Sequence, residues 1–360
     1  MKILITGICG FLGQWIAKGL LEQFDGLDVI GFDNLSRPGS QFNRSSIDQT
    51  GIQFHHGDLR VASDLDALPR TDWVIDCAAD ASVLAGTKVR DGTSPMATPK
   101  QLLENNLIGT LHLLEYCRRH HSGLILISTS RVYSTAKIAS VPLAASHSAF
   151  KLDFTKHLPA GVSDRGIDET FSTDPPLSIY GATKRSSEIM AQEYALAFEF
   201  PLRINRCGVL AGAGQLGRAD QGIFAFWIHS HCRRRPLQYI GFGGRGLQVR
   251  DCLHPRDVTA LVRKQILAGD DQNRPVIANV SGGSESARSL FEVTKWCDSK
   301  FGNHEIGSSH ESRPYDVPWL VLDSNRARDA WNWSPSLATE EILGEIADHA
   351  IEHPDWLQRT

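Results

Sequence analysis

The sequence predicts an α/β fold in which a doubly wound parallel sheet is joined by a smaller α/β domain toward the carboxyl end. Three observations support this prediction. Short apolar runs rich in β-branched residues alternate with helical patterns through the first half of the chain. A glycine-rich turn joins the first run to the first helical pattern. The alternation becomes irregular after about Arg203, which indicates a second unit.

The composition is that of a globular protein without special affinity for polyanions. The 360 residues are 41% hydrophobic and carry a net charge of −4, so neither nucleic acid nor an anionic membrane is expected as a partner. The seven cysteines have no regular spacing and no CxxC pair, which favours reduced thiols and no metal site. No apolar stretch typical of a signal peptide or membrane span precedes the glycine turn, so we expect a cytoplasmic location.

The first predicted strand, residues 3–6, leads into a loop with glycines at positions 7, 10 and 13, and an amphipathic helix follows through about Glu22. Glycine permits a tight turn and lets backbone amides approach a pyrophosphate, while the helix amino terminus supplies partial positive charge. The spacing is GxxGxxG, and Gly10 stands where the commoner fingerprint has no glycine. We expect a dinucleotide phosphate site at this loop.

The second predicted strand, residues 28–32, ends at Asp33, twenty residues after Gly13. A carboxylate at this place accepts hydrogen bonds from the adenosine ribose hydroxyls and repels a 2′-phosphate. Asp33 therefore favours NAD over NADP, although Arg37 slightly weakens that preference.

The later predicted strands end in residues suited to the same ligand. Asp58 follows a strand that begins at Gln53 and is placed to meet the adenine amine. A strand beginning at Trp73 ends in small residues, which let a cofactor lie against the backbone, and residues 123–127 lead to Ser128 and Thr129. A long helix is predicted over residues 102–120. Because the carboxyl ends of parallel strands meet at one edge, these groups should lie together.

Tyr180 and Lys184 are four residues apart on a predicted helix, so their side chains share one face. A cation beside a phenol favours the phenolate, and we therefore expect the pKa of Tyr180 to fall below its usual value near 10. Such a phenol can take a proton from an alcohol while a hydride leaves the same carbon. Many helices carry such a pair by chance, so it gains meaning only beside the nucleotide motifs.

Together these motifs resemble the extended short-chain dehydrogenases/reductases, the NAD-dependent nucleotide-sugar epimerase and dehydratase family, over essentially the whole chain. Arg250-Asp251 and Trp333-Ser334-Pro335 extend the resemblance. It implies a Rossmann-type fold, NAD as cofactor, a homodimer, and the catalytic set Thr129, Tyr180 and Lys184. The residues that the resemblance places around NAD are Gly7, Gly10, Phe11, Leu12, Gly13, Asp33, Asn34, Ser36, Arg37, Asp58, Leu59, Ala78, Ala79, Asp80, Asn106, Ser128, Tyr180, Lys184 and Cys207.

The residues after Thr129 argue against a dehydratase. The 4,6-dehydratases resemble Ser-Thr-Asp-Glu-Val-Tyr here, whereas this chain has Ser130 and Arg131, and an arginine cannot act as a base near neutral pH. The carboxyl half resembles the CDP-tyvelose (CDP-paratose) 2-epimerase branch in its Asp-Gln-Gly and Gln-Val-Arg-Asp-x-Leu-His stretches and in a long segment at 147–174. Where that branch resembles Arg-His-Ser-Ser, this chain has Arg206-Cys207-Gly208-Val209, which bears on the identity of the sugar. Residues 84–99 read as a surface loop.

We expect an NAD-binding Rossmann domain of residues 1–206 and 246–281 and a nucleotide-sugar-binding domain of residues 207–245 and 282–360. Arg250 and Arg313 are candidates for the substrate diphosphate because a guanidinium fork matches phosphate geometry; a surface ion pair is the alternative. The apolar rings at 224–227 are expected to be core more than base contacts, and His254 is expected to be structural. The substrate-binding candidates are Ser130, Val209, Gln215, Asp220, Gln221, Gln248, Arg250, Arg313 and Asp316.

The sequence thus predicts an isomerase: an NAD-dependent nucleotide-sugar epimerase that inverts carbon 2 of a CDP-hexose, or another NDP-hexose, through a transient keto sugar with hydride returned from bound NADH. Its expected setting is lipopolysaccharide or glycan biosynthesis. Two alternatives stay within the family, namely a nucleotide-sugar 4-epimerase and an NAD(P)H-dependent nucleotide-sugar reductase. A third is a non-catalytic dinucleotide-sensing protein on the same fold, although such proteins can dispense with the tyrosine or lysine that this chain has.

Overall fold

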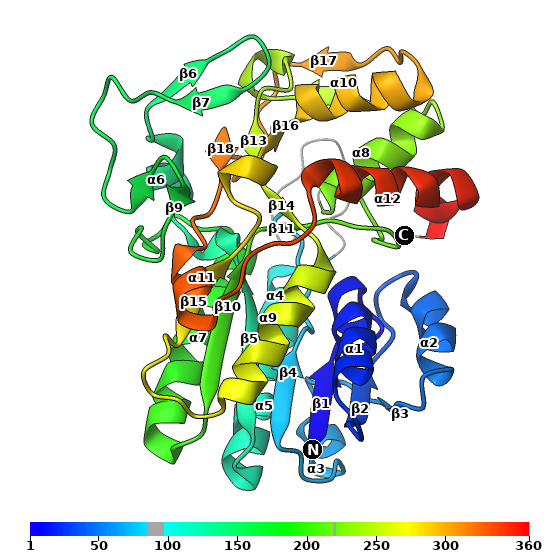
Figure 1. Ribbon diagram of the computed structural model, residues 1–360, viewed down its shortest axis with the longest axis vertical. Helices are drawn as coiled ribbons and strands as arrows, with labels where there is room; N and C mark the ends of the chain where they lie inside the picture. Colours follow the sequence, from blue (N-terminus) through cyan, green and yellow to red (C-terminus); the bar gives the residue numbers. More distant parts are fainter. Residues whose placement is uncertain (85–96, 219–220, 360) are drawn as a thin grey trace.

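The computed structural model describes residues 1–84, 97–218 and 221–359. Its central feature is a seven-stranded parallel sheet in the order β15-β10-β5-β4-β1-β2-β3 (Figure 1). The strands are β1 (Lys2–Thr6), β2 (Asp28–Asp33), β3 (Gln53–His56), β4 (Trp73–Asp76), β5 (Gly123–Thr129), β10 (Leu202–Cys207) and β15 (Ile277–Val280). This order is that of a Rossmann-type sheet, so the predicted fold class is confirmed.

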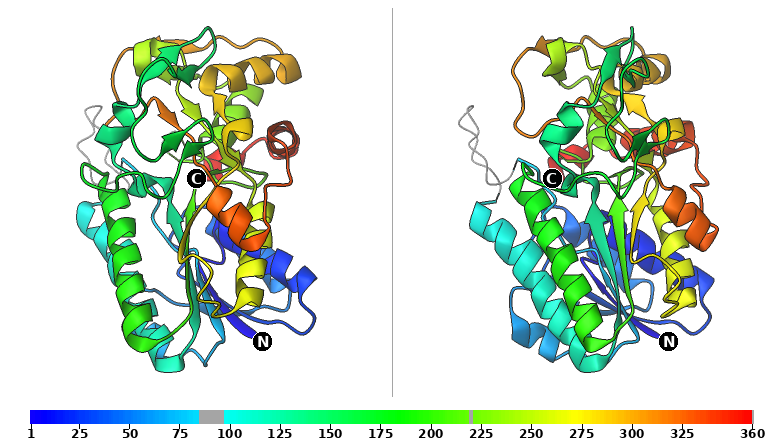
Figure 2. Two further views of the ribbon diagram at one scale, coloured as in Figure 1. Left: turned by 60° about the vertical axis from the view of Figure 1, so that its left-hand side comes forward. Right: turned by 90° about the vertical axis from the view of Figure 1, so that its left-hand side faces the viewer.

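Helices cover both faces of this sheet (Figure 2). One face packs against α1 (Phe11–Gln23), α9 (Pro255–Ala268) and α11 (Asn325–Trp331) through a shared apolar core. The other face packs against α3 (Ala62–Asp66), α5 (Gly109–His120) and α7 (Ile179–Phe198). Helix α2 (Ser40–Asp48) follows β2. Because both faces are buried, the central strands β1, β4 and β5 are mostly apolar runs without alternation, which is why they stand out in the sequence.

The helix predicted over residues 102–120 consists of three pieces: α4 (Pro99–Leu103), a π-helical turn η1 (Glu104–Ile108), and α5. Thr98 and Gln101 form a capping box that starts α4, so the last residues of the predicted surface loop belong to a helix start. Residues 85–96 of that loop lie outside the described residues. The π-turn presents Asn106 toward the carboxyl end of β4.

The second unit lies beyond the carboxyl ends of the main strands and has its own core between α8 (Ile223–Cys232), α10 (Leu290–Phe301) and α12 (Thr339–Glu352). Two predicted domain borders, at residues 206 and 281, each lie one residue from the end of a strand. Strand β10 ends at Cys207, and strand β15 ends at Val280. The remaining elements are β6 (Leu143–Ala145), β7 (Phe150–Leu152), β8 (Val162–Ser163), β9 (Gly166–Ile167), β11 (Val209–Leu210), β12 (Gln238–Ile240), β13 (Val249–Arg250), β14 (Cys252–Leu253), β16 (Arg288–Ser289), β17 (Gly307–Ser309), β18 (Trp319–Leu320), α6 (Thr135–Ala139), η2 (Ser130–Val132), η3 (Phe242–Gly244), η4 (Ser284–Ser286) and η5 (Trp356–Arg359).

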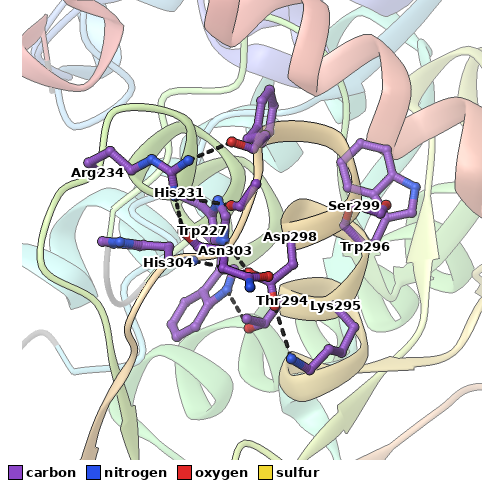
Figure 3. A network of polar contacts seen from close by, with 12 residues as sticks. Trp227, His231, Arg234, Thr294, Lys295, Trp296, Asp298, Ser299, Asn303 and His304 are labelled. Carbon is purple, nitrogen blue, oxygen red and sulfur yellow. Dashed lines mark hydrogen bonds and ion pairs between the residues drawn. The ribbon is translucent and has the colours of Figure 1, made fainter.

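A polar network fastens α8 to α10 (Figure 3). The indole of Trp227 donates to Thr294 Oγ1 at 2.9 Å, and Tyr239 OH donates to the same oxygen at 2.7 Å. One turn away, His231 Nε2 lies 3.0 Å from Asp298 Oδ1. These bonds are buried or partly buried, so they hold α8 in one orientation against α10.

Candidate active site

The glycine loop is shaped for close backbone approach. Gly7 has a φ of +62°, and a Cβ there would lie 2.9 Å from the backbone of Ala78. A Cβ on Gly13 would lie 2.3 Å from the carbonyl oxygen of Gly7. Helix α1 starts after Gly10, which has no side chain to cap it, so amides of the first turn face outward. The loop therefore fits a dinucleotide pyrophosphate.

Asp33 and Arg37 lie where the ribose is expected. The Asp33 carboxylate accepts from the amides of Cys9 at 2.9 Å and Leu35 at 2.8 Å, and burial raises its pKa above the usual value. Arg37 Nη2 donates to the carbonyl oxygen of Leu216 at 3.1 Å, across to the second unit. Because that contact engages the guanidinium elsewhere, the geometry favours the ribose of NAD over a 2′-phosphate.

Asp58 lies beside Asn34, whose Nδ2 donates to it at 3.0 Å. Arg60, which the sequence analysis did not single out, also donates to Asp58, and this pairing lowers the pKa of Asp58 to about 2. The carboxylate is thus ionised and held by Asn34 and Arg60, and its contact with the adenine amine stays a prediction. Leu12 and Leu59, also predicted cofactor contacts, have side chains in the core, so they can meet a ligand mainly through their backbones.

The segment after β4 is held by the π-turn. Asn106 Oδ1 accepts from the amide of Asp80 at 2.8 Å, and Asn106 Nδ2 donates to the Asp80 carbonyl at 3.0 Å. Asn106 therefore positions the wall that Ala78 and Ala79 form. Ser128 is turned away from this wall, because its hydroxyl donates to Glu188 at 2.6 Å and Glu188 also accepts from Arg206.

Two of the three predicted catalytic residues, Thr129 and Tyr180, meet at the carboxyl end of β5. Thr129 ends that strand, and its hydroxyl hydrogen-bonds the phenol of Tyr180. Lys184 is one turn further along α7, and its side chain is 1% exposed, while Tyr180 is 7% exposed. Ser178 caps α7 by accepting from the amide of Gly181 at 3.0 Å, which places Tyr180 in the first turn.

The predicted fall in the pKa of Tyr180 is wrong for this structure. Burial raises the pKa of Tyr180 to about 12, against the lowering effects of the Thr129 hydrogen bond and the Arg131 cation. Arg131 is the cation that acts most on the phenol here. The charge of Lys184 instead opposes the effect of burial on Cys207, whose thiol pKa is raised to about 12. The position of Lys184 on the same helix face therefore does not lower the pKa of Tyr180 below its usual value, because the effect of burial is larger.

A pocket of about 340 Å³ lies between the two units, and Arg131, two residues after Thr129, is one of its lining residues. Of the predicted substrate residues, it is lined by Val209, Gln221, Gln248, Arg250, Arg313 and Asp316. Gln215 and Ser130 are not among its lining residues. Gln215 instead donates to the carbonyl oxygen of Leu210 at 2.8 Å, and Ser130 is buried, with 5% of its surface exposed. Asp220 lies outside the described residues. The pocket also holds Arg131 and Arg288, which the sequence analysis did not propose as ligands.

Arg250 is oriented by the segment that carries Arg313. Its Nη2 donates to Asp316 Oδ1 and to the carbonyl of Val317, both at 2.8 Å. Arg250 is thus in an ion pair and also lines the pocket, and its role as a ligand of the substrate diphosphate stays a prediction. Gln248 has a buried Oε1 with no hydrogen-bond partner among the described residues, as expected of a pocket-lining ligand group.

The aromatic residues and His254 have mostly structural roles. Phe224 and Trp227 are 3% and 2% exposed, so the core prediction is confirmed for them, although both also border the pocket. Phe226 is half-buried at the pocket wall. His254 is fully buried, and its Nδ1 accepts from the amide of Arg256 at the start of α9, which confirms its structural role.

The fold and this site define a dinucleotide-binding α/β enzyme with a threonine, tyrosine and lysine beside a cationic pocket. The model of the NAD dependent epimerase/dehydratase family matches residues 3–281. The chain belongs to this family, and NAD is its cofactor. The predicted family, enzyme class and cofactor are thus confirmed.

Individual relatives are similar over the full chain. CDP-paratose 2-epimerase of Salmonella typhi is 30% identical over 97% of this chain and 98% of its own length. UDP-glucuronate 4-epimerase of Thermodesulfobacterium geofontis is 25% identical over 99% and 98%. The structure of UDP-glucose 4-epimerase of Thermus thermophilus with NAD is 25% identical, with a TM-score of 0.74 and coverage of 98% and 99%.

Three further observations concern the site and its surroundings. No helix in the described ranges is long and apolar enough to cross a membrane. Within those ranges there is also no group of three or more His, Cys, Asp or Glu side chains arranged to hold a metal ion. All seven cysteines are free thiols.

Proposed function

We propose that this protein is an NAD-dependent epimerase that inverts carbon 2 of a nucleoside-diphosphate hexose, with a CDP-hexose as the favoured substrate. The observation that carries the proposal is the complete Thr129, Tyr180 and Lys184 set beside a pocket that contains Arg250 and Arg313. The CDP-paratose 2-epimerase relative, similar over essentially the whole chain, supports the choice of carbon 2 and of cytosine as the base of the nucleotide.

Each residue of the site has a separate task. Tyr180 takes the proton of the sugar hydroxyl, and the Thr129 hydroxyl, already bonded to the phenol, holds the same oxygen. Lys184 would hold the nicotinamide ribose, and the glycine loop and Asp33 would hold the pyrophosphate and the adenosine ribose. Bound NAD supplies the acceptor and then the donor of one hydride. Tyr180 returns the proton after the keto sugar has presented its other face, so acid and base are one residue.

Nuclear magnetic resonance of the product tests this proposal. We expect the purified protein to carry NAD and to invert carbon 2 of at least one CDP-hexose. In heavy water the inverted carbon should take up no deuterium, because the hydride returns directly. Absence of both bound NAD and epimerisation would refute the proposal, and stoichiometric consumption of added NAD(P)H would identify a reductase instead.

The second candidate is a 4-epimerase, favoured by the similarity to UDP-glucuronate 4-epimerase. The same spectra separate the two, because each reports which sugar carbon has changed configuration. Arg131 stands where the dehydratases of this family have an acid, which supports an epimerase of either kind over water elimination.

We further propose a cytoplasmic homodimer that acts in lipopolysaccharide or other glycan biosynthesis. Seven free thiols support a reducing compartment. The helical segments α4, η1 and α7 pack beside one another (Figure 2). Support for the dimer comes from the apolar side chains that are exposed on these segments. Those side chains are Leu103, Ile108, Ile189 and Leu196. A second copy of the same helices would cover them.

A further inference from the structure

Arg131 is a cation of the pocket that stands outside the set of Thr129, Tyr180 and Lys184. It belongs to η2, two residues after Thr129, and its half-buried side chain lines the pocket. Its Nη1 donates to the carbonyl oxygen of Tyr315 at 3.3 Å. Arginine costs free energy to bury unless hydrogen bonds and charges compensate it, so a guanidinium here needs a reason.

Arg131 and Arg250 flank one short segment. Arg131 contacts the backbone of Tyr315, and Arg250 contacts Asp316 and Val317. Asp316 lies 2.8 Å from Arg250 and its charge also acts on Arg131, while the charge of Asp251 acts on Arg250 as well. Burial and the charge of Arg250 lower the pKa of Arg131 to about 10. An anion bound between the two guanidiniums would relieve their mutual repulsion.

The same residue reaches the reacting centre. The amide of Arg131 donates to Thr129 Oγ1 at 3.2 Å. The start of α7 is packed against its backbone, because a Cβ on Gly181 would lie 2.2 Å from the Arg131 carbonyl oxygen. The side-chain charge of Arg131 also acts directly on the Tyr180 phenol. The positive charge of Arg250 and Arg131 therefore extends from the pocket toward Tyr180.

The covalent structure of a nucleotide sugar links the position of this positive charge to the sugar carbon that reaches Tyr180. The sugar-linked phosphate is attached to carbon 1. The hydroxyl of carbon 2 is its direct neighbour, whereas the hydroxyl of carbon 4 lies across the ring. A phosphate held beside Tyr180 can therefore place the carbon-2 hydroxyl next to the phenol. With the phosphate in that position, the carbon-4 hydroxyl is far from the phenol. Building on the proposed function, we infer that Arg131 binds the sugar-linked phosphate and so selects carbon 2 for oxidation.

Binding of nucleotides without a sugar tests the phosphate contact independently of turnover. The NAD-loaded protein and its Arg131→Met and Arg131→Lys variants are titrated with CDP and with CMP, which lacks the second phosphate. We expect Arg131→Met to weaken CDP binding by about tenfold or more and CMP binding by less than about twofold. Arg131→Lys should retain most of the CDP affinity. Equal CDP affinity in the wild type and Arg131→Met would overturn the inference.

Arg119→Met is the matched control, since Arg119 lies on the surface of α5 and pairs with Asp66 at 2.6 Å, outside the pocket. It should bind both nucleotides like the wild type. Circular dichroism and retained NAD show that each variant is folded.

Product analysis then tests selection of the carbon. We expect Arg131→Met to raise KM for the CDP-hexose about tenfold or more and to lower the ratio of carbon-2 to carbon-4 inversion. If the wild type inverts carbon 2 and the variant does so with unchanged KM and product ratio, Arg131 does not select the carbon. If the wild type inverts no carbon-2 centre, the proposed function fails, and the CDP and CMP titrations still decide whether Arg131 binds phosphate.

Discussion

Tyr180 shows how burial and nearby charge compete at one side chain. The phenol is buried, and its pKa of about 12 is far above the working pH of most enzymes. Thr129 and Arg131 already act in the lowering direction. In the proposed mechanism, proton transfer from the sugar would depend on the Thr129 hydrogen bond and on positive charge close to the phenol, more than on the neighbouring lysine alone.

Replacing Tyr180 by phenylalanine keeps the ring and removes the acid/base. We expect kcat to fall by about 10²–10⁴-fold, because general acid–base catalysis is lost, while bound NAD stays near the wild-type amount. Turnover is measured by product formation, and NAD by absorbance after heat release. Tyr194→Phe is the control on the same helix, since Tyr194 bonds Glu115 away from the site. Full activity in Tyr180→Phe would contradict the assigned role.

Substitution of Gly13 is restricted by the atoms around it more than by its own backbone conformation. Because a Cβ there would lie 2.3 Å from the Gly7 carbonyl oxygen, Gly13→Ala must displace the loop. We expect a loss of roughly 1–3 kcal/mol in the free energy of unfolding and a clear loss of co-purifying NAD. Calorimetry and NAD release measure the two effects. Gly344→Ala is the control, because nothing lies within 4 Å of its Cβ position in α12, and it should be neutral or stabilising.

At the scale of elements, the region 102–120 was predictable as a helix but not in its internal geometry. A 3.6-residue apolar period marks the helix. The π-turn at Glu104–Ile108 instead depends on Asn106, which bonds the backbone of Asp80 in another segment. Such a tertiary contact has no local sequence pattern, and π-turns commonly occur at functional sites.

The contact between α8 and α12 should be sensitive to acid. His229 Nε2 lies 3.2 Å from His349 Nδ1, and burial lowers the pKa of His229 to about 3. The unfolded chain takes up this proton near pH 6.5, so the stabilisation is complete above that pH and is lost as the pH falls toward 3. Between pH 6.5 and 5 we expect the free energy of unfolding to fall by about 2 kcal/mol from this group.

Denaturant titrations over that pH range measure the slope. His229→Gln cannot be protonated, and it should flatten the decline while leaving the pH 7.5 structure intact by circular dichroism. An unchanged slope in His229→Gln would show that other groups govern the acid sensitivity.

At the scale of the whole molecule, the exposed apolar side chains of α4, η1 and α7 predict a dimer that a single charge should break. Leu196 is 79% exposed on α7. We expect Leu196→Glu to shift the protein toward monomer in sedimentation experiments, because a carboxylate would be buried against a second copy. Leu267→Glu is the control, since Leu267 is 60% exposed on α9, on the opposite face of the sheet. Equal masses for wild type and Leu196→Glu would place the interface elsewhere.

The sheet, the glycine loop and Asp33 were predictable because each is encoded locally, by an apolar run, by glycine spacing, or by position at a strand end. The pocket was only partly predictable. Arg131 meets Tyr315 across 184 positions of sequence, and Ser128 turns to Glu188 across 60. Side-chain directions of this kind arise when distant segments pack. The raised pKa of Tyr180 has the same origin, because burial is a property of the folded chain.

The bond from Arg37 to the carbonyl of Leu216 has a consequence for affinity. Arg37 lies at the expected ribose site, and Leu216 lies in the segment that leads toward Gln221 at the pocket wall. A ligand that fixes either end of this bond would also restrain the other end, so the second ligand would meet a more restrained site. We therefore expect dinucleotide and sugar nucleotide to strengthen one another's binding. Thermodynamic reciprocity requires the two enhancement factors to be equal.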